Sequence, residues 1–401
     1  MAWNHKSRIT TMAVKIQAVP GVFSAPAAPA DLIPVSPPTN GDDIVSADDP
    51  TATGSVWNAA RVYLGRTSNA GATFALRGPG GAAPPLANAW PQGRILQAAG
   101  FTEVRLAAAL TAALVAGSTT QALKLDAGAS AVDDFYIGMP IQHANIGTVG
   151  TVKGTSVVMD YDGTGKLATI GETIVAPPAG GNYTIPANLT YVLGTLTTAP
   201  PLLSVSIWRD KKRYDYMDCR PTSLTIDCPV SNEQNQGYPS VEFALKGLPA
   251  GTVDEASPSL PNSLLTSIPP YRAGKFYLDR VKLGHQSNRF TMSAETAGAS
   301  NANADAGQDA YEIMSGERGL ELDLNQMAIT DFAIDSRVDA QTVLGLMSVW
   351  GGAVGNRFAF SAPEVVLNPL NNPGDRNGFV NLTGNAAFTG VDKSAALSLF
   401  W

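Results

Sequence analysis

Glycine and proline recur along the whole chain and divide it into short segments. The 401 residues contain 39 glycines and 28 prolines, spread along the sequence rather than gathered in one region. Both residues favour turns and interrupt regular structure. Valine, threonine and alanine are abundant between them, which is typical of many short strands joined by turns. We therefore expect a mainly β protein, and the chain length favours two or three domains.

One stretch combines a strand, a tight turn and a helix. The alternation around Phe74 and Leu76 predicts a half-buried strand. The glycine and proline residues at 78–81 must end this strand. The apolar spacing that follows predicts a helix over Leu86–Ala99, with Gly100 just beyond its last turn.

Two features indicate that this unit is duplicated. Phe243–Gly247 repeats Phe74–Gly78, except that lysine replaces arginine. A second short helix is predicted over Asp339–Trp350. Similar strand blocks around two helices are typical of a duplicated β-rich domain.

The composition changes in the middle of the chain. Residues 117–187 are rich in glycine, threonine, valine and aspartate, between an alanine-rich and a proline-rich flank. We predict that they form a small inserted β module, which we expect to lie on the outside and to be removable. The predicted division is a first domain of residues 1–116 and 188–250, a linker of residues 251–274 and a second domain of residues 275–401. Loops are predicted over Asp42–Pro50 and Asn288–Gly316.

The chain is acidic and sparsely charged. Its net charge is −7 and only 15% of its residues are charged. Binding to nucleic acid requires clustered Lys and Arg, so such a function is disfavoured. The most basic run, Arg209–Arg213, is predicted to be a hairpin. The low charge suggests that other subunits cover much of the surface.

Cysteines and apolar runs give little sign of export or membrane insertion. Cys219 and Cys228 are too few for a disulfide framework. They could face each other across a hairpin, but reduced thiols are the favoured interpretation. No apolar run approaches membrane-spanning length, and a signal peptide is not expected.

No arrangement of residues points to catalysis. His5, His143 and His285 lie far apart and in no catalytic motif. Asp160, Asp162 and Thr164 match the first half of a calcium-binding loop, but the position that needs a bidentate Glu is a glycine. Asp-Gly is also a strong hairpin signal, so a plain turn is favoured. We therefore expect no enzyme, no cofactor and no metal.

The order of several motifs resembles that of the tail tube (major tail) proteins of long, non-contractile-tailed bacteriophages. The resemblance covers most of the chain outside residues 117–187. The motifs that carry it are Ala13–Gln17 with Pro20-Gly21, Asp31–Val35, Phe74–Gly78 followed by the helix ending at Phe101, Gly355–Arg357 with Ala362-Pro363, and Asp375–Gly378. The inserted module, through Asp133–Met139, resembles small β modules of other phage structural proteins.

This resemblance implies a fold and a function. The fold would be two β-sandwich or barrel domains, each with a flanking helix, plus the inserted module. The protein would assemble with itself into stacked rings that form the tail tube. If each chain carries two tube-type domains, three chains supply six domain positions, so a trimer of pseudo-sixfold symmetry is favoured over a hexamer of chains with one large domain each. The tape measure protein and genomic DNA would occupy the lumen transiently, and tail terminator and tail-tip proteins would bind the ends. No membrane partner is implied, and the location would be the virion, after assembly in the host cytoplasm.

One strand is a candidate for the lumen wall. Glu321 and Asp323 alternate with Leu320, Leu322 and Leu324, so the strand has an acidic and an apolar face. We expect the leucines to pack on the second predicted helix and the acids to face the lumen, with an outer solvent-facing strand as the alternative. The rival function is a secreted or surface adhesin that binds carbohydrate, and an enzyme ranks third.

Overall fold

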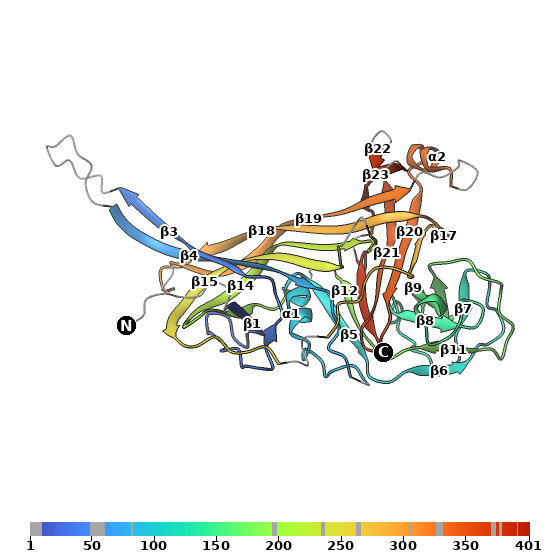
Figure 1. The fold of residues 1–401 in the computed structure, drawn as a ribbon, viewed down its shortest axis with the longest axis horizontal. Helices are drawn as coiled ribbons and strands as arrows, with labels where there is room; N and C mark the ends of the chain where they lie inside the picture. The colour runs from blue at the N-terminus through green and yellow to red at the C-terminus, as the bar shows by residue number, and fades with distance from the viewer. Residues whose placement is uncertain are drawn as a thin grey trace.

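The protein is mainly β, as the sequence predicts. The computed structural model describes residues 10–48, 61–81, 83–194, 199–233, 237–261, 266–304, 307–325, 332–369, 374–376, 379–390 and 392–401. Its strands form one large and one small antiparallel sheet (Figure 1). Within the described parts of the chain, neither helix is long and apolar enough to cross a membrane.

The large sheet draws strands from both ends of the chain. Its N-terminal members are β1 (Thr10–Ile16), β2 (Leu32–Ile33), β3 (Thr39–Asp48), β4 (Arg61–Ala75), β5 (Phe101–Leu106), β12 (Asn188–Leu193), β13 (Leu203–Arg209), β14 (Lys212–Pro229) and β15 (Ser240–Asp254). Its C-terminal members are β16 (Lys275–Leu278), β17 (Val281–Lys282), β18 (His285–Ser300), β19 (Gln308–Asn325), β20 (Val343–Gly351), β21 (Arg357–Leu367), β22 (Gly374–Arg376), β23 (Phe379–Phe388) and β24 (Ala396–Phe400).

A second sheet of six strands lies beside it. Its elements are β6 (Leu110–Ala113), β7 (Ala122–Lys124), β8 (Pro140–His143), η1 (Val152–Gly154), β9 (Thr155–Asp162), β10 (Leu167–Ile170) and β11 (Asn182–Ile185). We call residues 110–185 the inserted unit. A separate core that includes Leu123, Met139, Ile141 and Tyr183 holds the unit together. It sits at one end of the molecule, to the right of the C-terminal strands in Figure 1.

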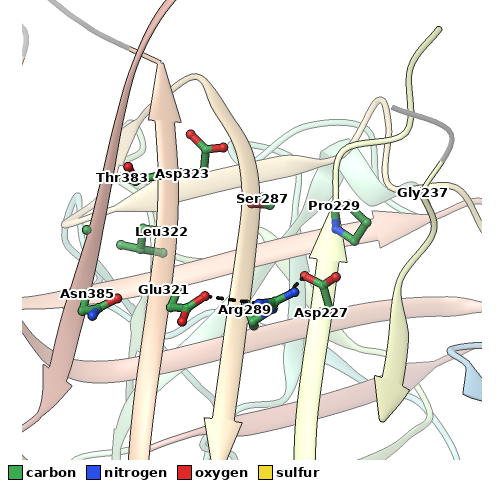
Figure 2. A pocket seen from close by; sticks show the side chains of 11 residues that line it. Asp227, Pro229, Gly237, Ser287, Arg289, Glu321, Leu322, Asp323, Thr383 and Asn385 are labelled. Carbon is green, nitrogen blue, oxygen red and sulfur yellow. Dashed lines mark ion pairs between the residues drawn. The ribbon is translucent and has the colours of Figure 1, made fainter. Parts of the chain in front are cut away.

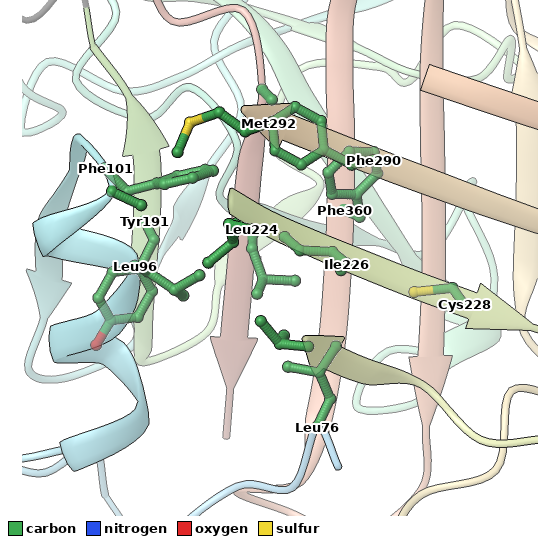
Figure 3. Packing of buried hydrophobic residues seen from close by; sticks show 14 of the residues in the cluster. Leu76, Leu96, Phe101, Tyr191, Leu224, Ile226, Cys228, Phe290, Met292 and Phe360 are labelled. Atoms are coloured by element: carbon green, nitrogen blue, oxygen red, sulfur yellow. The ribbon is translucent and has the colours of Figure 1, made fainter. Parts of the chain in front are cut away.

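The first predicted helix exists and caps the main core. α1 (Pro91–Ala98) is shorter than the predicted 86–99, and Gly100 adopts the positive φ of 101° expected at a helix C-terminus. Figure 3 shows Leu96 on α1 next to Tyr191, with Leu224 and Phe290 farther into the core. A Cβ on Gly93 would lie 2.0 Å from the Tyr191 hydroxyl oxygen, so only glycine allows α1 to approach β12 this closely.

The second predicted helix is wrong. Residues 343–351 form strand β20, and the described residues just before it form a short helix, α2 (Ile334–Asp339), none of whose residues is buried. β20 is buried on both faces, with Leu346 and Trp350 in the main core and Met347 and Val349 against the inserted unit. A continuous apolar run of this kind lacks the two-residue period that identifies a strand.

Two predicted loops are also strands. Asp42–Asp48 belongs to β3, which pairs with β4, and residues 49–50 lie outside the described residues. The predicted loop Asn288–Gly316 is most of the β18–β19 hairpin. Much of each hairpin is exposed, so backbone pairing rather than apolar burial defines these two segments. The first residues of the predicted linker, 251–254, likewise belong to β15.

Strands from the two predicted domains join in one sheet. β12 pairs with β5 on one side and with the C-terminal strand β24 on the other. Of the repeated segments, Phe243–Gly247 lies on β15, whereas Phe74–Gly78 begins at the end of the neighbouring strand β4 and continues beyond it; the Phe74 and Phe243 ring centroids are 6.0 Å apart. The backbone N–H of Gly78 donates to Asn356 Oδ1 at 2.8 Å, so two of the resembling motifs meet in space.

Candidate functional surfaces

One face of the central strands is polar and the other is apolar. β15, β14, β18 and β19 are consecutive neighbours in the sheet. Along β14, Leu224, Ile226 and Cys228 are buried, whereas Thr225 and Asp227 are half-buried on the opposite face. The same alternation continues on the three neighbouring strands. We call the solvent side of these four strands the polar face.

An arginine lies between two acids at the centre of the polar face. The strand register places Asp227, Arg289 and Glu321 side by side on β14, β18 and β19, with Asn385 beyond them on β23 (Figure 2). The Arg289 guanidinium lies 3.6 Å from Asp227 and 3.5 Å from Glu321. Because the three side chains are between 32% and 53% exposed, these ion pairs contribute little to stability.

The groove around Arg289 is acidic. It measures about 480 Å³ and is lined mainly by polar side chains, among them Ser287, Asp323 and Thr383. Three carboxylates, those of Asp227, Glu321 and Asp323, accompany one guanidinium in this lining. A polar, shallow lining differs from the apolar enclosure typical of small-molecule sites. The excess of carboxylates repels phosphate groups.

The two predicted lumen residues occupy this face but differ in exposure. The Glu321 side chain is 53% exposed, whereas Asp323 is only 7% exposed. Leu320, Leu322 and Leu324 join the main core. The expectation that they pack on a helix over Asp339–Trp350 is wrong, because that segment is β20.

The exposure difference predicts different effects of the same substitution. Glu321→Lys should change the midpoint of thermal unfolding by no more than about 2 °C, because the new side chain stays in water. Asp323→Lys should cost about 2–4 kcal/mol, because a buried position must accept an ammonium group. Thermal and urea unfolding of the two variants measure this, and equal losses would contradict the assignment.

A long hairpin projects from the body and is apolar near its tip. Beyond its pairing with β15, β4 pairs with β3 alone, and the two strands extend away from the molecule (Figure 1). We call the described part of this extension, residues 42–48 and 61–67, the arm. Its large apolar residues are exposed: Ile44 (67%), Val45 (48%), Val62 (48%), Tyr63 (63%) and Leu64 (57%).

Both faces of the arm carry exposed apolar residues. Ile44 and Val45 are neighbours on one strand and therefore point to opposite faces. An isolated two-stranded hairpin is marginally stable in water, and exposed apolar clusters mark interaction sites. The arm therefore has the character of an element that inserts into another protein surface.

The calcium-like loop is a hairpin turn. Asp162 Oδ1 accepts the backbone N–H groups of Thr164 and Gly165, both at 2.9 Å, between β9 and β10. Burial and the nearby Asp134 carboxylate raise the pKa of Asp160. Across the residues that the structure describes, no group of three His, Cys, Asp or Glu side chains could hold a metal ion.

The remaining candidates are packing residues. The thiols of Cys219 and Cys228 are free and buried, and both lie on β14 rather than across a hairpin from each other. Arg209–Arg213 forms the predicted hairpin between β13 and β14. His143 is buried on β8, which lowers its pKa, and His5 lies outside the described residues.

His285 makes stability depend on pH. Its ring stacks on Phe276 at a centroid distance of 4.0 Å, and burial lowers the pKa of His285 to about 4. The unfolded chain binds this proton below about pH 6.5. Folding should therefore lose about 2–3 kcal/mol of stability as the pH falls from 6.5 to 4. Urea unfolding at pH 7 and pH 4.5 measures the loss in the free energy of unfolding, which should be smaller for His285→Phe than for the unsubstituted protein. Equal losses in the two proteins would contradict this origin.

Sequence reasoning missed the arm and most of the groove. The sequence signals for the arm were the apolar pairs Ile44-Val45 and Tyr63-Leu64, the first of which lies within a predicted loop. The groove was missed because Arg289 lies within another predicted loop. Neither the models of known protein families nor the sequences of curated proteins match this chain.

Proposed function

We propose that this protein is a structural subunit that assembles with itself into stacked rings, forming a tube whose bore is lined by the polar face. The observation that carries the proposal is the arm, whose apolar residues have no cover within the described chain. Insertion of the arm into a neighbouring copy removes these residues from water.

Open strand edges support the same conclusion. Among the described strands, β3 pairs only with β4 and β22 pairs only with β23, so each leaves one edge open. Unpaired edges are templates for pairing with another chain. The strands of one chain pack around an apolar core rather than an open bore, so the wall of a tube must be shared between copies.

The polar face suits a conduit for DNA. Its carboxylates exceed its cations around Arg289, so the wall repels phosphate and lets DNA pass without binding it. The motif order that resembles tail tube proteins supports the proposal that the tube belongs to a phage tail. The tape measure protein and DNA are then the transient contents, and terminator and tip proteins the partners at its ends.

Sedimentation velocity and negative-stain microscopy over a range of protein concentrations test the assembly. Rings or tubes are expected, whereas monomers at every concentration and salt would overturn the proposal and favour the adhesin. The paired helices no longer support a duplicated domain, because the second predicted helix is a strand and α2 is not buried as α1 is. The chain length is the remaining argument for a trimeric ring. Native mass spectrometry separates three from six copies by a twofold difference in mass.

Glu321→Lys tests the position of the polar face. In a phage that carries this change, DNA ejection should slow, because a cation in the bore attracts phosphate. The rate of DNA release in vitro measures the effect. Unchanged release by phage with intact tails would place Glu321 on the outside of the tube.

A further inference from the structure

The inserted unit lies against a specific surface of the large sheet. Val157 and Met159 on β9 pack against Met347, Val349 and Ala359 on β20 and β21, and Phe400 on β24 completes the cluster. A second contact joins Ile137 of the unit to Val192 and Ala396. We call the large-sheet side of these contacts the seat. β9 is thus buried on both faces, between the core of the unit and the seat.

Part of the seat is made of small or flexible side chains, namely Ala359, Ala396 and Met347. A Cβ on Gly138 would lie 2.3 Å from the Ala396 Cβ, and one on Gly171 would lie 2.6 Å from the Met347 sulfur. Thr190 and Ser398, on the same side of β12 and β24 as Ala396, bond to each other at 2.9 Å. Methionine is unbranched and flexible, so Met347 tolerates more than one packing arrangement. Apolar contact here favours docking without fixing one orientation.

A charged contact is buried at the edge of the seat, in addition to the hydrogen bonds from Ser156 Oγ to Met347 Sδ and from Arg280 Nε to the Ile170 carbonyl oxygen. Lys275 Nζ on β16 donates to both carboxylate oxygens of Glu172 in the unit, at 2.7 and 3.0 Å. The two residues are 7% and 3% exposed. Burial lowers the pKa of Lys275, and the Glu172 carboxylate partly offsets this effect. Burial and, to a smaller extent, the Glu172 carboxylate raise the pKa of Tyr277 to about 12. The other ion pair, Lys393 with Asp134 at 2.8 Å, is about one-third exposed and therefore weak.

We propose that the Lys275–Glu172 ion pair is the lock that selects one docked orientation of the inserted unit on the seat. A buried ion pair adds little net stability compared with apolar residues of similar size, because desolvation offsets the attraction. Its specific effect is to penalise every arrangement that leaves either charge buried without its partner. In this molecule, that penalty excludes the alternative packings that the flexible Met347 side chain of the seat allows.

Distance measurements between two spin labels test the lock. Ala179→Cys in the unit and Ser293→Cys on β18 give exposed labelling positions, while the native Cys219 and Cys228 are buried. In the labelled full-length chain we expect one narrow distance distribution. Lys275→Met combined with Glu172→Leu should keep the unfolding midpoint within a few degrees and broaden or split the distribution. The exchanged pair, Lys275→Glu with Glu172→Lys, should restore a single distance.

Each other outcome contradicts the proposal. A narrow, unchanged distribution in the double apolar variant would mean that packing alone fixes the orientation. Loss of the folded state in that variant would mean that the pair serves stability instead. A broad distribution in the exchanged pair would show that complementary charge is insufficient.

Discussion

A chain without residues 110–185 is expected to lose most of its stability and its soluble yield. The deletion uncovers Met347, Val349, Ala359 and Phe400, which the inserted unit keeps at or below 1% exposure. The three larger side chains contribute about 1.5–3 kcal/mol each when buried, which sums to about 5–9 kcal/mol as an upper estimate. This is comparable to the whole stability of a typical domain. Thermal unfolding and the soluble fraction after expression measure the effect.

Closing the gap is not itself a source of strain. Leu106 and Asn188 are partners in the register of β5 and β12, so a short flexible linker joins them directly. The matched control is the same deletion with Met347→Thr and Val349→Thr, which makes the uncovered face polar and should recover solubility. Unchanged stability of the plain deletion would support the sequence-based expectation that the unit is removable.

The second large effect concerns the arm. Ile44→Asp combined with Tyr63→Asp should raise the concentration needed for assembly by at least about 100-fold, because burying two carboxylates in an interface costs several kcal/mol. The monomer should keep its unfolding midpoint, since both residues are exposed. Sedimentation velocity as a function of concentration measures the shift.

A valine far from the arm provides the control. Val175 in the inserted unit is 78% exposed, and Val175→Asp should leave assembly unchanged. If the arm variant assembles as readily as this control, the arm is not buried in the assembly. If both variants fail to assemble, the inserted unit also belongs to the contact.

Local patterns predict part of this structure. The strand pattern at Phe74 and the apolar spacing before Gly100 identify β4 and α1, because each element shows one apolar face to one core. β20 lacks the two-residue alternation of a half-buried strand, because Leu346 and Met347 are buried on opposite faces by different parts of the molecule. Only the fold reveals that a second surface exists there.

The sequence predicts that a polar face exists, but not which residues form it. The alternation of Glu321 with its leucine neighbours indicates a two-sided strand from sequence alone. That Asp227 and Arg289 stand beside Glu321 depends on the register of three strands, which no local pattern encodes. The greater burial of Asp323 depends on the same register, which places Ser287 and Thr383 on either side of it.

The position of β24 imposes a delay on folding during synthesis. β12 ends at residue 193, yet its partner β24 begins at residue 396, about 200 residues later. At roughly 5–20 residues per second, the ribosome needs about 10–40 s to supply that partner. Throughout this interval one edge of β12 stays open, and the seat lacks the strand that carries Ala396 and Phe400. Premature self-association is therefore a hazard of synthesis, and slower chain elongation should increase aggregation rather than relieve it.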